Sequence, residues 1–168
     1  MFGDGAAVAL IKANAGAPLN HCQMETFPDA AEHAQLRGGG VMRMPSSPLT
    51  TEADHLFDMQ GDALLRFTLP RLTRFLRNFL ASADLTVDDI DLVVPHQASK
   101  SGMQIVEKLG FSQEKTVNVL SDYGNCVAAS IPLALSIANQ TGRIETGDKV
   151  LLLGTAAGMS IGAGILQW

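Results

Sequence analysis

Apolar residues recur with helical spacing in one long segment of the chain. Elsewhere they form short runs of the length expected for strands. Between residues 62 and 81, apolar side chains recur every three or four positions, the spacing of a helix with one buried face. Pro70 is expected to kink this helix or to mark its true start, because proline lacks the backbone N–H that a helix uses. The predicted buried face consists of Leu65, Leu69, Leu72, Phe75, Leu76, Phe79 and Leu80.

After Asp84, short apolar runs alternate with helical segments. The runs predict strands at 91–95, 115–120, 149–154 and 160–168, with helices at 99–109 and 126–140. Gly110 and Gly142 stand where these two helices would end. Continuous apolar strands separated by helices are typical of a sheet covered on both faces. The expected fold is therefore α/β, a mixed and mostly parallel five-stranded sheet covered by helices, with the last strand antiparallel.

The first third of the chain carries weaker patterns. Residues 2–11 (FGDGAAVALI) predict a glycine-rich turn that runs into an apolar strand, and residues 20–27 predict a second, less regular strand. Residues 37–51 are rich in Gly, Pro, Ser and Thr, which is typical of an ordered loop or lid rather than a core element.

Composition narrows the class of protein. The chain has 168 residues, 46% of them hydrophobic and 17% charged, as expected for one globular domain. Its net charge of −5 argues against nucleic-acid binding, and its apolar runs are too short to span a membrane. No secretion signal opens the sequence, and Cys22 and Cys126 lack metal-ligand spacing, so neither a disulfide framework nor a metal site is expected. These features predict a cytoplasmic protein.

Three loops carry residues that can do chemistry. They are Pro95–Ala98 after a predicted strand, Tyr123–Asn125 before a predicted helix, and Gly154–Gly158 between the last two strands. Ligands of open α/β sheets bind beyond the carboxyl ends of the strands, so these loops are expected to converge on one crevice. His96 and Asn125 can each donate a hydrogen bond without adding a charge, and two such donors aimed at one oxygen form an oxyanion hole.

The motifs in these loops resemble those of a known enzyme family. PHQA (95–98) before a helix, GN (124–125) before a helix rich in Ala and Ser, and a glycine-bearing loop before the last strand occur in that order. FGDGAA (2–7) and DMQG (58–61) resemble two further segments of the same pattern. Over nearly its whole length the chain resembles the C-terminal half of β-ketoacyl-acyl-carrier-protein synthase III, a condensing acyltransferase of the thiolase superfamily.

The resemblance implies condensation of an acyl thioester with malonyl-carrier protein, with decarboxylation, as in fatty acid or polyketide synthesis. In the family, a histidine and an asparagine hold the malonyl thioester oxygen, and by motif these are His96 and Asn125. Gln97 and Gly124 would neighbour the substrate pocket. Acyl-CoA and malonyl-ACP thioesters would be the substrates, with no further cofactor. The family usually has asparagine where this chain has Ser99, which leaves the acyl-chain preference open.

The resemblance also has implications for the N-terminal half of the family's enzymes, which carries the nucleophile. A cysteine there accepts the acyl group, and the backbone of Ala157 and Gly158 would share an oxyanion hole with that cysteine's N–H. Residues 1–16 would be the last strand of the N-terminal half, and residues 17–168 the C-terminal thiolase-like domain. The chain alone is expected to be inactive and to pair with the missing half or to self-associate, because its apolar strand edge would be exposed. The complete enzyme would be a homodimer.

A basic helix suggests an acidic partner. Residues 63–83 contain no Asp or Glu, and their arginines lie opposite the predicted apolar face. Acyl carrier proteins are acidic, so the resemblance implies that Arg66, Arg71 and Arg74, together with Lys100, bind carrier protein or coenzyme A. An ordinary solvated helix face is the alternative for these arginines.

Two other functions remain open from the sequence. A non-catalytic carrier-protein-binding subunit of a synthase complex would keep the fold and the basic helix but would not need His96 and Asn125. A hydrolase with Cys126 as its nucleophile has little support, because a small cysteine at the start of a helix usually packs in the core. At the level of single residues, a structural role is the alternative for His96, and a helix N-cap is the alternative for Asn125.

Overall fold

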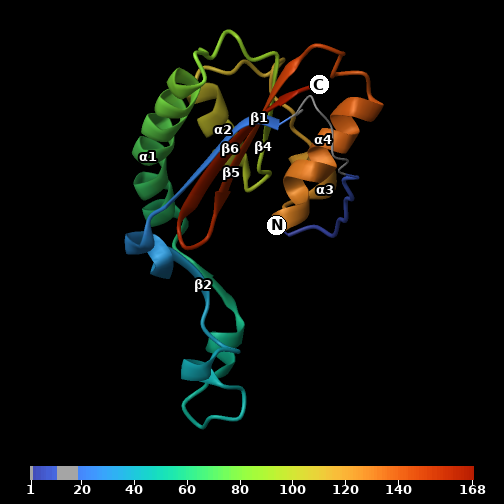
Figure 1. The fold of residues 1–168 in the computed structure, drawn as a ribbon. Helices are drawn as coiled ribbons and strands as arrows, with labels where there is room; N and C mark the ends of the chain where they lie inside the picture. Colours follow the sequence, from blue (N-terminus) through green and yellow to red (C-terminus); the bar gives the residue numbers. More distant parts are fainter. Residues whose placement is uncertain (1, 11–18) are drawn as a thin grey trace.

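Four strands form the central sheet of the computed structural model in the order β1–β6–β5–β4, and helices lie on both of its sides (Figure 1). The structure describes residues 2–10 and 19–168. The strands of this sheet are β1 (Leu19–Thr26), β4 (Leu92–Pro95), β5 (Lys149–Ala156) and β6 (Ser160–Gln167). The helices are α1 (Gly61–Ser82), α2 (Lys100–Lys108), α3 (Leu120–Tyr123) and α4 (Ser130–Gln140).

The sheet is mixed, and its last strand is antiparallel as predicted. β4 pairs in parallel with β5, whereas β6 pairs antiparallel with both β5 and β1. The strand predicted at 115–120 is reduced to one parallel bridge between Thr116 and Val93. The described sheet therefore has four full strands instead of the predicted five. The chain leaves the sheet early because the Val119 N–H donates to the side chain of Gln97 rather than to a strand (3.1 Å).

α1 is one helix with a single buried face. It begins at Gly61, so Pro70 is not its start, and Pro70 lies inside the helix on the exposed side. Leu65 is 36% exposed, contrary to the prediction, and Thr68 is buried in the same half of the helix. The Thr68 hydroxyl faces the Sδ of Met159 at 3.8 Å, which explains why a polar residue belongs there. Leu69 is partly buried against the core. Five residues of the predicted face are confirmed as buried: Leu72, Phe75, Leu76, Phe79 and Leu80.

Two apolar clusters cover the two faces of the sheet. Phe75 and Phe79 of α1 pack with Leu151 and Ile161 on one face, together with residues of α2. α4 packs on the other face, with small side chains such as Ala134 next to the strands. The helix predicted at 126–140 begins instead with a 3-10 turn, η4 (Val127–Ala129), and becomes α-helical afterwards. No helix within residues 2–10 and 19–168 is long and apolar enough to cross a membrane.

A narrow arm projects from one end of the sheet (Figure 1). It follows the 3-10 helix η1 (Pro28–His33) and consists of β2 (Ala34–Leu36) paired antiparallel with β3 (Phe57–Met59). Between them, η2 (Val41–Arg43) and η3 (Glu52–His55) alternate with turns, which fits the loop predicted at 37–51. The exposed large apolar residues of the arm are Leu36, Val41, Met42, Met44, Leu49, Leu56, Phe57 and Met59. Exposed apolar surface favours association, so self-association stays a prediction for this chain.

The segment before β1 does not form the predicted strand in its described part. Phe2 makes a single parallel bridge with Asn125, and residues 3–10 belong to no strand. Val8 is 98% exposed and Leu10 is 83% exposed, so these apolar residues have no sheet partner in the described chain. The expected first unit was residues 1–16. Residues 1 and 11–16 of that unit lie outside the described residues. The strand predicted at 20–27 is confirmed as β1.

Candidate active site

His96 follows directly after β4 and is held there by the neighbouring strand. Its backbone N–H donates to the carbonyl of Leu153 in β5 at 2.8 Å, which continues the parallel pairing by one residue. The ring is partly buried, and burial lowers the pKa of His96 below its ordinary value of 6.5, because a charged imidazolium loses water there. His96 is therefore a neutral imidazole at pH 7, which can donate one hydrogen bond without carrying a charge.

We expect the pKa of His96, measured by NMR titration of its ring, to lie below 6.5. The unfolded chain then binds this proton more readily than the folded chain, so stability rises with pH through the window between the two pKa values. Conversely, folded stability is lost as the pH falls below 6.5. Urea midpoints across this range should lose part of their pH dependence in His96→Gln but keep it in the exposed control His55→Gln. A titration midpoint at or above 6.5 would contradict this account.

Gln97 braces the loop from inside the core. It is 1% exposed. Its Nε2 donates to the carbonyls of Pro95 and Val117 at 2.9 and 3.0 Å, and its Oε1 accepts from the Val119 N–H at 3.1 Å. Both side-chain donors are used by backbone groups. The amide therefore points into the core and ties β4 to the segment before α3, and the position of Gln97 beside a substrate pocket stays a prediction.

Asn125 connects the second loop to the first. Its Nδ2 donates to the carbonyl of Ala98 at 3.3 Å, and its Oδ1 accepts from the Val127 N–H at 2.9 Å. The second interaction is a turn contact between the side chain and the backbone two residues later. The residue before η4 is Cys126, and η4 has no side-chain cap, so Asn125 is not the N-cap that the alternative required. Ala98 lies two residues after His96, so the structure brings the two predicted loops into contact. The second N–H of the amide is used by no hydrogen bond among the described residues.

A cavity of about 590 Å³ opens beside these loops. Gly124 lines it and has a φ of +67°, a conformation that favours glycine over residues with a side chain. Lys100 lines the cavity from the first turn of α2, where the Ser99 hydroxyl accepts the Gly102 N–H at 3.1 Å and caps the helix. The cavity lining consists of Phe2, Ala98, Ser99, Lys100, Leu120, Ser121, Tyr123 and Gly124. Neither His96 nor Asn125 is in this lining, so the roles of Gly124 beside the substrate and of Lys100 in binding carrier protein or coenzyme A stay predictions.

The predicted glycine-bearing loop is shorter than expected. Gly154 lies inside β5, so only residues 157–159 connect β5 to β6. Ala157 is exposed and Gly158 is partly buried. The turn is anchored by Met159, which exchanges two backbone hydrogen bonds with Phe27, at 2.7 and 3.1 Å. The backbone at Ala157 and Gly158 therefore has a fixed support, and its role as an oxyanion hole stays a prediction.

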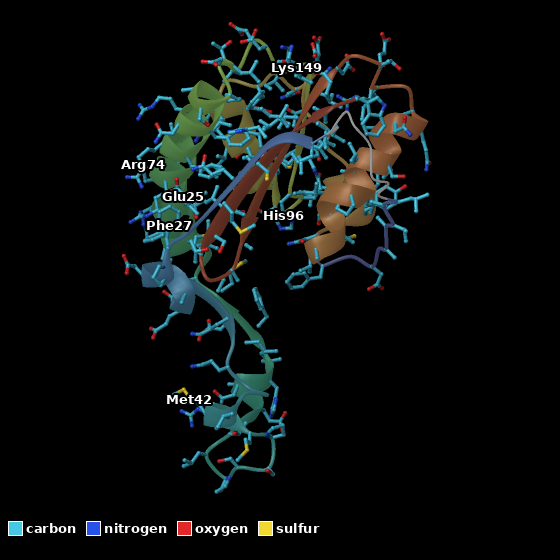
Figure 2. All side chains as sticks on the ribbon, viewed as in Figure 1. Glu25, Phe27, Met42, Arg74, His96 and Lys149 are labelled. Atoms are coloured by element: carbon cyan, nitrogen blue, oxygen red, sulfur yellow. The ribbon has the colours of Figure 1, made fainter. Side chains whose placement is uncertain are left out.

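The predicted basic residues lie on two helices, the arginines on α1 and Lys100 on α2. Arg71 lies with its guanidinium 3.5 Å from the ring centre of Phe67 and 5.6 Å from that of Phe27, and its Nη1 donates to the Phe67 carbonyl at 3.0 Å. The Arg71 cation is therefore stacked on aromatic rings, and its contact with carrier protein or coenzyme A stays a prediction. Arg66 and Arg74 are exposed, and Arg74 points outward from α1 in Figure 2. They remain candidates for an acidic partner, on a different element from Lys100.

Three residues that line the cavity, Phe2, Leu120 and Ser121, were not predicted from the sequence. Ser121 shows no signal in its local pattern, and Phe2 precedes the GDG motif without any indication that it reaches this loop. Cys126 is 7% exposed and its Sγ donates to the Tyr123 carbonyl at 3.3 Å, so it is packed rather than open to a substrate. In the described ranges, no three His, Cys, Asp or Glu side chains gather into a possible metal site.

Comparison with known proteins identifies the family. The model described as 3-oxoacyl-[acyl-carrier-protein (ACP)] synthase III C terminal matches residues 80–168, more than half of the chain. The chain belongs to the 3-oxoacyl-[acyl-carrier-protein] synthase III family. It is 31% identical over 170 residues to beta-ketoacyl-[acyl-carrier-protein] synthase III of Syntrophomonas wolfei, covering 100% of this chain and 51% of that protein. For the protein of the same name from Clostridioides difficile, identity is 34% over 171 residues, covering 100% of this chain and 52% of that protein.

A solved structure extends the likeness to the fold. The beta-ketoacyl-[acyl carrier protein] synthase III of Thermus thermophilus aligns with a TM-score of 0.78 and 31% identity, over 94% of this chain and 48% of that chain. The thiolase-like fold predicted for this synthase III family member is confirmed by that likeness. The chain spans about half the length of the curated relatives that it matches.

Proposed function

We propose that this chain supplies the C-terminal part of a condensing acyltransferase that joins an acyl thioester to malonyl-carrier protein with decarboxylation. The hydrogen bond from Asn125 Nδ2 to the carbonyl of Ala98, at 3.3 Å, carries the proposal, because it joins the loop of Asn125 to the loop of His96. Both residues are neutral donors next to the carboxyl end of β4, where α/β sheets bind ligands. The names of the relatives, beta-ketoacyl-[acyl-carrier-protein] synthase III, support the reaction class.

The proposed reaction has two steps, decarboxylation and carbon–carbon bond formation. In the malonyl thioester, the bond from the methylene carbon to the carboxylate breaks, carbon dioxide leaves, and the electron pair moves onto the thioester as an enolate. His96 and Asn125 donate hydrogen bonds to the enolate oxygen. The enolate carbon then attacks an acyl group held as a thioester on a cysteine of the family's other half, and the cysteine thiolate leaves. The backbone N–H groups at Ala157 and Gly158 would stabilise the oxygen of that acyl group.

The charge state of His96 suits this role. An imidazolium at this position would require burial of a charge, whereas the neutral ring donates without that penalty. The substrates bring the reactive thioesters, so the proposal needs no metal and no further cofactor. We place the reaction in the cytoplasm and propose a homodimer for the complete enzyme; the exposed apolar arm supports an assembly of some kind.

The test is a fused chain in which the N-terminal half of the Syntrophomonas wolfei relative precedes residue 1 of this sequence. We expect the fusion to decarboxylate malonyl thioesters and to condense them with acyl thioesters, and we expect this chain alone to form no condensation product. Release of labelled carbon dioxide and formation of the β-ketoacyl product are measured separately. A folded fusion that binds carrier protein but releases no carbon dioxide would instead support a non-catalytic carrier-binding subunit.

Charge reversal on α1 tests the proposed carrier-protein contact. Arg74→Glu combined with Arg66→Glu is expected to weaken binding of acyl carrier protein to this chain about tenfold at low salt, with less effect at high salt because ions screen exposed charges. Arg74→Glu alone is compared with Lys108→Glu, an exposed lysine of α2 whose reversal changes the net charge equally. Affinity is measured by titration at two salt concentrations. Equal affinity of the double variant and the unmodified chain at low salt would remove α1 from the contact.

A further inference from the structure

The segment Phe2–Gly5 lies directly against the loop that carries Asn125. Phe2 forms a parallel bridge with Asn125, and the Gly3 N–H donates to the Asn125 carbonyl at 3.0 Å. The main chain of Asn125 is therefore held from one side by a segment more than a hundred residues away in the sequence. The side chain of Asn125 is held separately, by its hydrogen bond to the carbonyl of Ala98.

The approach of the two backbones leaves no room for a side chain. A Cβ atom on Gly3 would lie 1.7 Å from the carbonyl oxygen of Tyr123 and 2.9 Å from its carbonyl carbon. A Cβ atom on Gly5 would lie 2.9 Å from the Sγ of Cys126. Contacts this short are repulsive, and on Gly3 the obstacle is backbone that cannot rotate away. Gly3 is therefore required by close approach, and its motif is explained by this packing.

The contact reaches Asn125 by a short route. The carbonyl of Tyr123, which Gly3 contacts, accepts a hydrogen bond from the Cys126 Sγ–H at 3.3 Å. This hydrogen bond joins the residues on either side of Gly124 and Asn125, and Gly3 and Gly5 pack against the same two residues. No regular helix or strand holds Asn125 itself, because α3 ends at Tyr123 and η4 begins at Val127. Displacement of residues 2–5 would consequently break the backbone hydrogen bond that they make to Asn125.

We propose that Gly3 is a positioning residue for Asn125, acting through the close packing of Phe2–Gly5 on Tyr123–Cys126. The inference rests on the proposed function only for the effect of the Asn125 position on catalysis. The packing itself can be measured in this chain alone. A side chain at residue 3 pushes the segment away, breaks the Gly3–Asn125 hydrogen bond and shifts the amide of Asn125 relative to His96.

The first experiment follows amide hydrogen exchange and NMR shifts in this chain. Gly3→Ala is expected to move the backbone and side-chain signals of Asn125 and to raise exchange of the residue 3 N–H at least about tenfold, as for a locally opened hydrogen bond. Gly61→Ala is the matched control, because a Cβ there meets nothing within 4 Å. Unchanged Asn125 signals in Gly3→Ala would overturn the proposal.

The second experiment measures malonyl decarboxylation in the fused chain. Gly3→Ala should lower kcat up to about 100-fold with KM little changed, since a displacement near 1 Å can have that effect. In an Asn125→Ala background it should have little further effect, because both changes act on one group. Independent, multiplicative losses would overturn the inference. If Asn125→Ala itself leaves the rate unchanged, the proposed function fails, and the exchange experiment still decides the role of Gly3.

A milder pair covers the case in which Gly3→Ala does not fold. Gly5→Ala is expected to lower kcat, and adding Cys126→Ala should restore most of it, because the clashing Sγ is then removed. Cys126→Ala alone serves as the baseline. Lack of rescue in a folded double variant counts against the packing mechanism.

Discussion

His96→Ala and Asn125→Ala are each expected to lower malonyl-thioester decarboxylation in the fused chain by about 100- to 1000-fold, the usual effect of removing one oxyanion donor. Each substitution removes a hydrogen bond to an oxygen that becomes negative only as carbon dioxide leaves. The loss should therefore appear mainly in kcat, with a smaller change in KM. Carbon dioxide release under saturating malonyl thioester measures it directly.

Two features of this experiment separate chemistry from folding. Cys126→Ser and the exposed Gln104→Ala should stay close to the unmodified rate, since neither side chain is assigned to the reaction. The double variant of His96 and Asn125 should lose less than the product of the two single losses, because both donors serve one oxygen. Near-normal rates in both single variants, with the urea midpoints unchanged, would end the proposed mechanism.

Gln97→Leu is expected to destabilise the fold by about 3 kcal/mol or more, because it leaves three buried backbone groups without partners at about 1 kcal/mol or more each. Leucine fills a similar volume, so the loss reports the hydrogen bonds to Pro95, Val117 and Val119 rather than a cavity. An effect of this size is a large part of the stability of a typical domain. The urea midpoint of this chain is the measurement.

The matched control for this change is Gln104→Leu. Gln104 is exposed on α2, so the same chemical change there should shift the free energy of unfolding by less than about 0.5 kcal/mol. Similar midpoints for the two variants would mean that the buried brace contributes nothing. A folded Gln97→Leu protein that also loses decarboxylation in the fused chain would show that the brace supports the neighbouring His96.

Local pattern predicted most of the regular elements correctly. The spacing of apolar residues in α1 foretold five buried positions, because one helix turn fixes which residues share a face. The same pattern misplaced Leu65, which is exposed, since helical periodicity does not tell where the sheet beneath the helix ends. The strand expected at 115–120 failed for a related reason: its N–H at Val119 found a side-chain partner instead of a strand.

The sequence by itself determined which residues are candidates for the chemistry and the order in which their loops occur. His96 and Asn125 were found from motifs because their loops stand at strand and helix ends, which are readable along the chain. The α/β class was readable for the same reason, since apolar periodicity is a local property.

Only the tertiary structure decided what the neighbours of these residues do. Gln97 turns into the core, Arg71 stacks on Phe67, and Gly3 packs on Tyr123. The partners of Gln97 and Gly3 include residues that are distant in the sequence and are brought close by folding, whereas Phe67 is one helical turn before Arg71. A side chain's role depends on which donors, rings and carbonyls surround it. Those surroundings are set by long-range packing, which the composition and spacing of a sequence do not specify.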